Sequence, residues 1–520
     1  MNRYSITTAI NYPNGAPHIG HAYEAIVADA FARWHRLAGE EVHFQTGVDE
    51  YGLKMVKTAR EQGLSPRELT DRNVPAFQAM ARALHLSHDR FVRTTEPAHA
   101  RAAQALWTRL QAAGDLYRDR YEGWYSVRDE AFYAEGELME GEGGARLSPH
   151  GTPVDWTTEA GWFFRLSRYA EPLLAHIAAN PAFVQPDSRR NEVVRFLEGG
   201  LTDLSVSRSS FDWGVPVPGD PASVMYVWVD ALTNYLTGLG FPDETPAMVR
   251  FWPADAHLIG KDIVRFHAIY WPALLMSAGL PLPRSILAHG FILNRGVKES
   301  KSLGNTSDPI EIVEAFGVDA LRYFLLREVS FGQDGSWSPE AIVTRANADL
   351  ANNLGNLAQR SLSMVAKQCN GRMPARRILR PEDDELIGRL RAAQQEAETA
   401  MRAHQPHLAL EVIWAAATSA NGYFADAAPW AGRKTDPERA DTVLAVTLDA
   451  VRRLAILASW AVPAGAARLL DQLAVAADRR SFADLDTPVE PGCALPVPSG
   501  VFPRLEVPAR WMTGGEGDPI

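Results

Sequence analysis

The first fifty residues constrain the fold most, because a strand, a turn, a helix and a second strand follow one another there. YSITTAI is a short β-branched stretch, and NYPNGAP has the Pro and Asn-Gly steps of a turn. Residues 18–38 have apolar side chains at helical spacing and stop at Gly39, after which EVHFQTGV is strand-like. Strands joined by such a helix run parallel, which predicts a doubly wound, Rossmann-like α/β sheet.

Changes in composition along the chain predict an insertion and a helical domain. An aromatic and acidic stretch separates two α/β segments, and amphipathic segments follow around 341–367, 382–403, 407–427 and 436–472. The last forty or so residues are rich in Pro and Gly and read as an extended, docked or partly frayed tail. The predicted boundaries are 1–115 and 223–293 for the two α/β halves, 116–222 for the insertion, 294–350 for a loop region, 351–480 for the helical domain and 481–520 for the tail.

Bulk composition excludes several classes of protein. The net charge of −11, from 52 basic and 63 acidic residues, argues against a generally basic nucleic-acid coat but leaves room for a local basic face. The two cysteines, Cys369 and Cys493, cannot form a zinc cluster by themselves, so we expect neither structural zinc nor a disulfide scaffold. Because we find no signal-peptide pattern and no apolar stretch of membrane-spanning length, we expect a cytoplasmic protein without membrane contact.

The motif PHIGH places two imidazoles, His18 and His21, three residues apart at the start of the first helix. They share one helix face, where the N–H groups of a helix N-terminus attract anions. Gly20 lets a ligand approach the backbone there. The motif favours phosphate binding, with both rings donating to phosphoryl oxygens in a transition state. The alternative is a pair of histidines near a surface turn without a ligand.

The loop NRGVKESKSLGN carries two lysines, Lys298 and Lys301, separated by Glu299 and Ser300. Ammonium groups neutralise a developing pyrophosphate charge, and the serine hydroxyls add donors. The alternative is a solvated basic loop. Glu299 lies where an anionic ligand would least favour it, and we consider two arrangements. In the first, the Glu299 side chain points to solvent, and in the second it pairs with a lysine of the open loop.

The two motifs in this order match the two-part signature of class I aminoacyl-tRNA synthetases. The chain resembles the methionyl-tRNA synthetase family from about Tyr4 to Trp430. The segments that carry the resemblance are ITTAINYPNGAPHIGHAYE, FQTGVDEYGLKM, YVWVDALTNYL, LIGKDIVRFHAIYWPALL, AHGFI, KESKSLGN and NLGNLAQR. It implies a catalytic α/β domain with a connective insertion, a stem-contact region within 294–350 and an all-α anticodon-binding domain at 351–480.

The resemblance also implies the reaction. Members of the family activate methionine with ATP to methionyl-adenylate, releasing pyrophosphate, and transfer the methionyl group to the 3′ end of tRNA(Met). The expected partners are methionine, ATP with Mg²⁺, and tRNA(Met). Because no further dimerisation domain follows the helical domain, we expect a monomer.

Family roles transfer to the matching positions of this sequence. The implied catalytic residues are His18, His21, Lys298 and Lys301. The implied ATP-binding residues are Asn14, Gly20, Gly260, Asp262, His289, Gly290, Ile292 and Ser300. The implied methionine-binding residues are Ala9, Ile10, Tyr12, Asp49, Trp228, Ala231, Leu232, Tyr235, Ile263 and His267. The implied anticodon-reading residues are Asn356, Arg360 and Trp430, and no metal ligand is implied.

The implied amino acid pocket suits methionine, because a thioether favours an apolar slot with aromatic rings. Either His267 or Tyr12 is expected to contact the sulfur, and Asp49 the substrate ammonium. Taken singly, each aromatic residue of the set is equally well explained by plain packing.

Several positions depart from the family pattern, namely Glu299, Tyr51, Asn11 and Arg265, and the insertion lacks Cys-x-x-Cys pairs. Three alternatives follow. The chain is a tRNA-binding homologue without catalysis, a paralogue that charges another acceptor, or an enzyme that is catalytically altered or tolerates a methionine analogue. The histidine and lysine pairs favour an enzyme, and the anticodon-matching residues argue against another acceptor.

Overall fold

The structure of the chain, a computed structural model, describes residues 2–127, 131–133, 135–141, 144–299 and 306–511. Its centre is a six-stranded sheet in which neighbouring strands run parallel. The strand order is β3 (Arg90–Arg93), β2 (Glu41–Val48), β1 (Arg3–Thr8), β14 (Ala256–Gly260), β15 (Ile286–His289) and β9 (Val184–Gln185). The predicted doubly wound α/β fold is confirmed.

Helix α1 (Ile19–Leu37) connects β1 to β2 and is buried along most of its length. Its side chains are apolar on most faces because the sheet lies on one side and α12 (Val318–Glu328) packs against another. The remaining helices of the catalytic part are α2 (Leu53–Glu61), α3 (Pro66–Ala83), α4 (Pro97–Ala112), α7 (Val227–Leu232), α8 (Asn234–Thr237), α9 (Pro246–Phe251), α10 (Trp271–Ser277) and α11 (Pro309–Phe316).

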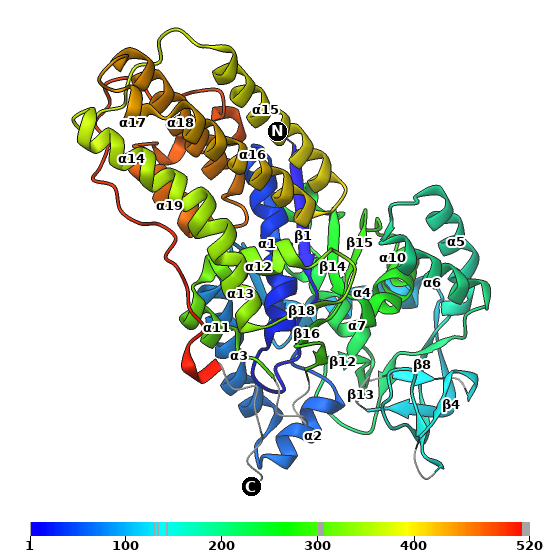
Figure 1. Cartoon of the computed structure of the whole chain (residues 1–520). Coiled ribbons are helices and arrows are strands. Elements are labelled where there is room, and N and C mark those ends of the chain that lie inside the picture. The colour runs from blue at the N-terminus through cyan, green and yellow to red at the C-terminus, as the bar shows by residue number, and fades with distance from the viewer. Residues whose placement is uncertain (1, 128–130, 134, 142–143, 300–305, 512–520) are drawn as a thin grey trace.

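The predicted insertion forms a lobe to one side of the central sheet (Figure 1). Its long strands β4 (Leu116–Ser126) and β8 (Asp155–Phe164) pair antiparallel, with β5 (Ala131–Tyr133) and β10 (Leu204–Ser205) outside them. The other short strands here are β6 (Met139–Glu140), β7 (Arg146–Leu147), β11 (Ser207–Arg208), β12 (Pro216–Val217) and β13 (Asp220–Met225), and the helices are α5 (Ala170–Ala179) and α6 (Asp187–Glu198). Strand β9 lies within the predicted range 116–222 but pairs with β15 of the central sheet.

A small three-stranded sheet follows the catalytic part, with β16 (Ile292–Asn294) between β17 (Val297–Lys298) and β18 (Gly335–Trp337). The chain beyond it is helical, as predicted. Its helices are α13 (Pro339–Arg345), a π-helical stretch (Ala346–Gly355), α14 (Asn356–Gln368), α15 (Pro381–Arg402), α16 (Pro406–Ala427), α17 (Pro429–Gly432), α18 (Pro437–Ala458) and α19 (Pro463–Gln472). The segment expected to be helical over 436–472 is two helices, because Pro463 cannot continue the bonding of α18 and starts α19 instead.

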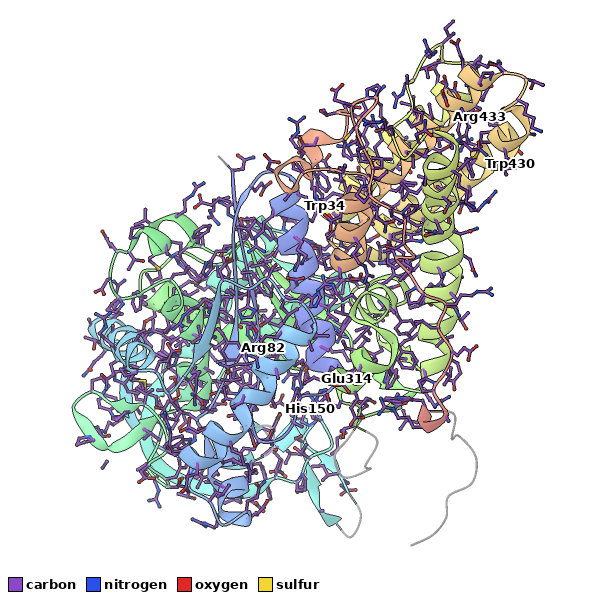
Figure 2. The ribbon with its side chains drawn as sticks, turned by 90° about the vertical axis from the view of Figure 1, so that its left-hand side faces the viewer. Trp34, Arg82, His150, Glu314, Trp430 and Arg433 are labelled. Carbon is purple, nitrogen blue, oxygen red and sulfur yellow. The ribbon has the colours of Figure 1, made fainter. Side chains whose placement is uncertain are left out.

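The helical and catalytic parts share one apolar core. Trp34 lies where α1 meets the helical part (Figure 2), and its ring centroid is 5.9 Å from that of Trp460. Deeper in this interface Arg322 pairs with Asp29 of α1 at 2.8 Å, and both side chains are fully buried. Within the described ranges, no helix is long and apolar enough to cross a membrane.

Candidate active site

A cavity of about 350 Å³ opens at the carboxyl ends of β1, β2 and β14, the edge where α/β sheets bind ligands. Ala9 follows β1, Asp49 follows β2 and Ile263 follows β14. All ten residues predicted to bind methionine line this cavity: Ala9, Ile10, Tyr12, Asp49, Trp228, Ala231, Leu232, Tyr235, Ile263 and His267. Both halves of the α/β domain therefore contribute to one pocket.

Two hydrogen bonds fix the proton on the His267 ring. Nδ1 lies 3.0 Å from the Ile263 carbonyl oxygen, to which it donates, so Nε2 is the acceptor of the Tyr235 hydroxyl at 2.7 Å. Burial lowers the pKa of His267 to about 4, which keeps the ring neutral. Both ring nitrogens of His267 are therefore engaged within the protein.

Tyr235 is held in place by a second buried histidine, His257, on which its ring stacks with centroids 4.0 Å apart. The indole N–H of Trp271 donates to His257 Nε2 at 3.2 Å, so His257 Nδ1 carries the proton and donates to Thr7 Oγ1 at 2.7 Å. Burial holds the pKa of His257 well below its usual value. This side of the pocket is consequently uncharged.

Aromatic rings form another wall of the cavity. The Trp228 and Phe266 rings stack with centroids 3.7 Å apart and planes 8° apart. Phe266 was not among the predicted residues, although it directly precedes His267 in the sequence. A neutral cavity with stacked rings suits a polarizable thioether better than a charged side chain.

Charged side chains of both signs also line the cavity. Asp49 is buried, with 4% of its surface exposed, and Lys54 near the start of α2 also lines the cavity. The Lys54 ammonium lies 5.1 Å from the centre of the Tyr12 ring. A carboxylate and an ammonium together match the ammonium and carboxylate of an α-amino acid. Lys54 was not predicted, and its only sequence signal is its place just after Asp49 in the segment GVDEYGLK.

The insertion closes one side of the cavity with Tyr133, His150 and Thr152. The Thr152 hydroxyl lies 2.7 Å from Ser126 Oγ, so strand β4 and the turn before β8 hold each other. His150 is labelled in Figure 2. None of these residues was predicted, because their approach to the pocket depends on how the insertion packs against the catalytic part.

The PHIGH motif is a helix cap in which each histidine accepts a backbone N–H. His18 Nδ1 accepts from Gly20, and His21 Nδ1 accepts from the backbone of His18, both at 3.1 Å. The neutral rings therefore carry their proton on Nε2. They stack with centroids 3.8 Å apart. A Cβ on Gly20 would lie 2.9 Å from the His18 ring, so glycine leaves room for that ring as well as for a ligand.

Three of the predicted ATP-binding residues gather where β14 and β15 end. Gly260 pairs in register with His289, and a Cβ on Gly260 would lie 2.6 Å from the Asp262 carboxylate, which lines the cavity. His289 Nε2 lies 3.0 Å from a carboxylate oxygen of Glu24, and burial raises the pKa of that carboxyl. Glu24 was not predicted.

The other predicted ATP-binding residues have different surroundings. A Cβ on Gly290 would lie 2.2 Å from the Gln333 carbonyl oxygen, so backbone packing alone requires glycine there. Ile292 is a core residue of β16, and Asn14 lies in the turn between β1 and α1. Ser300 lies outside the described residues.

The KESKS loop is described only at its edges. Lys298 ends β17, but its side chain is not described, and Lys301 lies outside the described residues. Of the two arrangements considered from the sequence, the side chain of Glu299 does not simply point to solvent, and pairing with a loop lysine falls outside the described side chains. Its carboxylate accepts the Ser307 hydroxyl at 2.5 Å, the Ser307 backbone N–H at 3.2 Å and the indole N–H of Trp337 at 3.3 Å.

The three predicted anticodon-reading residues lie in the helical part. Asn356 and Arg360 are four residues apart on α14 and hence on one face of that helix. The Arg360 guanidinium lies 5.5 Å from the centre of the Trp430 ring, and 47% of Trp430 is exposed. Trp430 lies at the far end of the helical part (Figure 2), so any base bound there is remote from the cavity.

Metal ligands were neither predicted nor found among the residues that the structure describes, where no group of three or more His, Cys, Asp or Glu side chains could hold an ion. The expectation of a zinc-free insertion stays a prediction. Magnesium held mainly by substrate phosphates and water needs no such group.

Comparison with known proteins identifies the family. A model described as tRNA synthetases class I (M) matches residues 4–144 and 145–362, and one for the anticodon binding domain of methionyl tRNA ligase matches 373–511. The methionine–tRNA ligase of Brucella suis biovar 1 is 56% identical over 503 residues, covering 96% of this chain and 98% of the relative.

Solved structures agree with these matches. Mycobacterium tuberculosis methionyl-tRNA synthetase in complex with methionyl-adenylate superimposes with a TM-score of 0.95 at 55% identity, covering 97% of this chain and 100% of that one. The apo form of the same enzyme gives a TM-score of 0.88 at 52% identity, covering 98% and 99%. The chain belongs to the methionyl-tRNA synthetase family.

Proposed function

We infer that this chain activates methionine with ATP to methionyl-adenylate and transfers the methionyl group to the 3′ end of tRNA(Met) for protein synthesis. The observation that carries this inference is the cavity, because ten residues from both halves of the domain line one pocket with several aromatic rings, and Lys54 adds an ammonium to the carboxylate of Asp49. The catalytically altered or analogue-tolerant alternative is not favoured.

We propose that the substrate ammonium pairs with Asp49 and that the methionine side chain lies among Tyr12, Trp228 and Tyr235. The buried carboxylate and the uncharged rings described above support this orientation. The substrate carboxylate then attacks the α-phosphorus of ATP in line, forming the new phosphorus–oxygen bond as pyrophosphate leaves. Positioning and charge stabilisation supply the rate in such a transfer.

We propose that His18 and His21 donate from Nε2 to phosphate oxygens as negative charge develops. The tautomers fixed by the two backbone N–H groups support this role. Gly260, Asp262 and His289 are proposed to contact the nucleoside, and Lys298 and Lys301 the leaving phosphates. Magnesium is proposed to arrive with ATP and to reduce the charge on its phosphates.

For the second step, we propose that Asn356, Arg360 and Trp430 read the anticodon by edge hydrogen bonds and stacking. The exposed cation–aromatic pair on the helical part supports this proposal. We further propose that the enzyme works in the cytoplasm, where translation uses its product. A monomer is proposed, and sedimentation analysis tests it.

Amino acid-dependent ATP–pyrophosphate exchange across the standard amino acids tests the proposed function. Exchange with methionine well above all others is expected, followed by charging of tRNA(Met). Exchange with leucine or isoleucine but not methionine would overturn the specificity, and no exchange with any amino acid would favour a non-catalytic homologue. Lys301→Ala is expected to lower the exchange rate far more than it raises the methionine KM.

A further inference from the structure

We propose that Glu299 is a positioning residue for the ATP-dependent step, held by Ser307 and Trp337, and that the C-terminal segment supports it through Trp511. The C-terminal segment is defined here as residues 481–511. The proposal rests on the proposed function, because it assumes that the neighbouring lysines act on ATP.

The Glu299 carboxylate receives three donors from two directions. The hydroxyl and backbone N–H of Ser307 approach at 2.5 and 3.2 Å, and the Trp337 indole N–H at 3.3 Å. Ser307 directly precedes Asp308, which caps α11 by accepting the N–H of Ile310 at 2.8 Å. One carboxylate therefore ties the end of β17 to the start of α11, the two points between which the KESKS loop runs.

Trp337 is a rigid partner for this carboxylate. It is 1% exposed, and its strand β18 pairs with β16, so its indole is held by the surrounding core. Its ring centroid lies 6.0 Å from that of Trp511, with the planes 73° apart. Trp511 also contacts Phe316 at the end of α11, at 6.1 Å. Trp511 thus touches both elements to which Glu299 is tied.

The C-terminal segment fixes Trp511 to the helical part. Gln472 of α19 exchanges two hydrogen bonds with Ser499, at 2.8 and 3.0 Å, and Asn347 exchanges two with Leu505, both at 2.8 Å. Figure 1 shows the segment in red, running from the helical domain to a short helix beside α11. A continuous line of contacts therefore connects the helical part to Glu299.

This arrangement explains how an acidic residue is tolerated in a phosphate-binding loop. A carboxylate that accepts charge-assisted hydrogen bonds from Ser307 and Trp337 is oriented by them. Those donors keep the negative charge next to Ser307 and Trp337, close to the end of β17. Without them the carboxylate could turn toward the ATP phosphates and repel them.

Glu299→Ala tests the first part, with initial rates of methionine-dependent ATP–pyrophosphate exchange. The KM for ATP is expected to rise about tenfold, while the KM for methionine stays within about twofold, because only the loop loses its tie. Glu299→Gln keeps one acceptor oxygen for the Ser307 hydroxyl and the Trp337 indole N–H, and is expected to recover part of the ATP KM. Glu314→Gln removes an exposed carboxylate from α11 and serves as the matched control.

Two outcomes overturn this part: an unchanged ATP KM in folded Glu299→Ala, or equal rises in both KM values, which would indicate a general structural defect. Thermal unfolding of each variant establishes folding. If the wild-type protein shows no methionine-dependent exchange, the proposed function fails instead, so the two failures are distinguishable.

Trp511→Ala tests the second part. An aromatic contact of this kind is worth roughly a threefold change in ATP KM. The effect is expected to disappear in a Glu299→Ala background, because Trp511 acts through Trp337 on Glu299. Val497→Ala, at an 89% exposed position of the same segment, is the matched control. Additive effects of the two changes, or no effect of Trp511→Ala, would overturn the role of the C-terminal segment.

Discussion

His21 Nδ1 accepts the backbone N–H of His18 at 3.1 Å, while the two rings stack 3.8 Å apart. The same bond closes the helix cap and selects the tautomer with the proton on Nε2. Helix capping and phosphate chemistry therefore use opposite nitrogens of one ring. Mutations that separate the two uses test the proposed role of the motif.

His21→Gln is expected to keep the cap, since glutamine at this position of a capping box also accepts the first backbone N–H. The loss of the ring donor is expected to lower kcat for ATP–pyrophosphate exchange by about 100-fold, with the thermal midpoint little changed. His21→Ala loses both functions and is expected to lower the thermal midpoint as well. Unchanged kcat in His21→Gln would contradict the catalytic role.

The buried His267 makes stability depend on pH. Its pKa of about 4 in the folded protein lies below the ordinary value of 6.5, so between these values the unfolded chain binds more protons. Stability is therefore complete above about pH 6.5 and falls as the pH drops toward 4. Over the whole window this histidine contributes a loss of about 3 kcal/mol.

Urea unfolding of wild type and His267→Gln at several pH values measures this contribution. The difference in unfolding free energy between the two is expected to shrink from pH 7 to pH 4.5, because only the wild type carries this penalty. His404 has a similarly lowered pKa of about 4 and is present in both proteins, so its contribution cancels. A pH-independent difference would show that His267 is not held neutral.

Breaking the ion pair of Arg322 with Asp29 is expected to cost much more unfolding free energy than breaking an exposed pair, because both side chains are fully buried. Arg322 also donates to the carbonyls of Leu84, Trp460 and Ala461. Arg322→Leu removes one of the two cationic partners of Asp29, which keeps Arg33 at 2.7 Å, and deprives the three carbonyls of their donor. A loss of about 3–5 kcal/mol of unfolding free energy is expected in urea titrations.

Arg389→Leu is the matched control for that measurement. Arg389 pairs with Glu385 on α15, where both side chains are more than half exposed. A loss below about 0.5 kcal/mol is expected there. Similar losses in the two variants would contradict the assignment of Arg322 as a joint between the catalytic and helical parts.

Sequence reasoning succeeded where a motif is local. The helical spacing after NYPNGAP and the strand that follows it sufficed for the parallel sheet, and the family resemblance that the motifs carry led to ten of the residues that line the cavity. It failed for Tyr133, His150 and Thr152, because nothing near them in the sequence records that the insertion packs against the pocket. Sequence reasoning also did not find the contact of Glu299 with Trp337, since the two residues meet only when β18 pairs with β16.

Composition did not decide whether the end of the chain is docked on the protein or frayed, and packing decides it. The Pro- and Gly-rich end of the chain fitted either a frayed or a docked tail. The structure shows residues 481–511 docked, because side chains such as Asn347 and Gln472 satisfy its backbone groups where no strand or helix does. Those partners are more than twenty residues away, beyond the reach of local patterns.

Trp430→Ala is expected to separate the two steps of the reaction. The indole is 47% exposed and stands beside Arg360 at the far end of the helical part, so it is available for stacking with a base but remote from the cavity. Stacking of a base on an aromatic ring is worth about 1–3 kcal/mol, so the KM for tRNA(Met) in charging assays is expected to rise between about fivefold and 150-fold. Methionine-dependent ATP–pyrophosphate exchange, which needs no tRNA, is expected to stay unchanged.

Leu408→Ala, another exposed apolar position of the helical part, provides the control, with both activities retained. A Trp430→Ala protein with a normal KM for tRNA(Met) would remove this residue from the anticodon site, whereas a parallel loss of exchange would indicate that the helical part is misfolded.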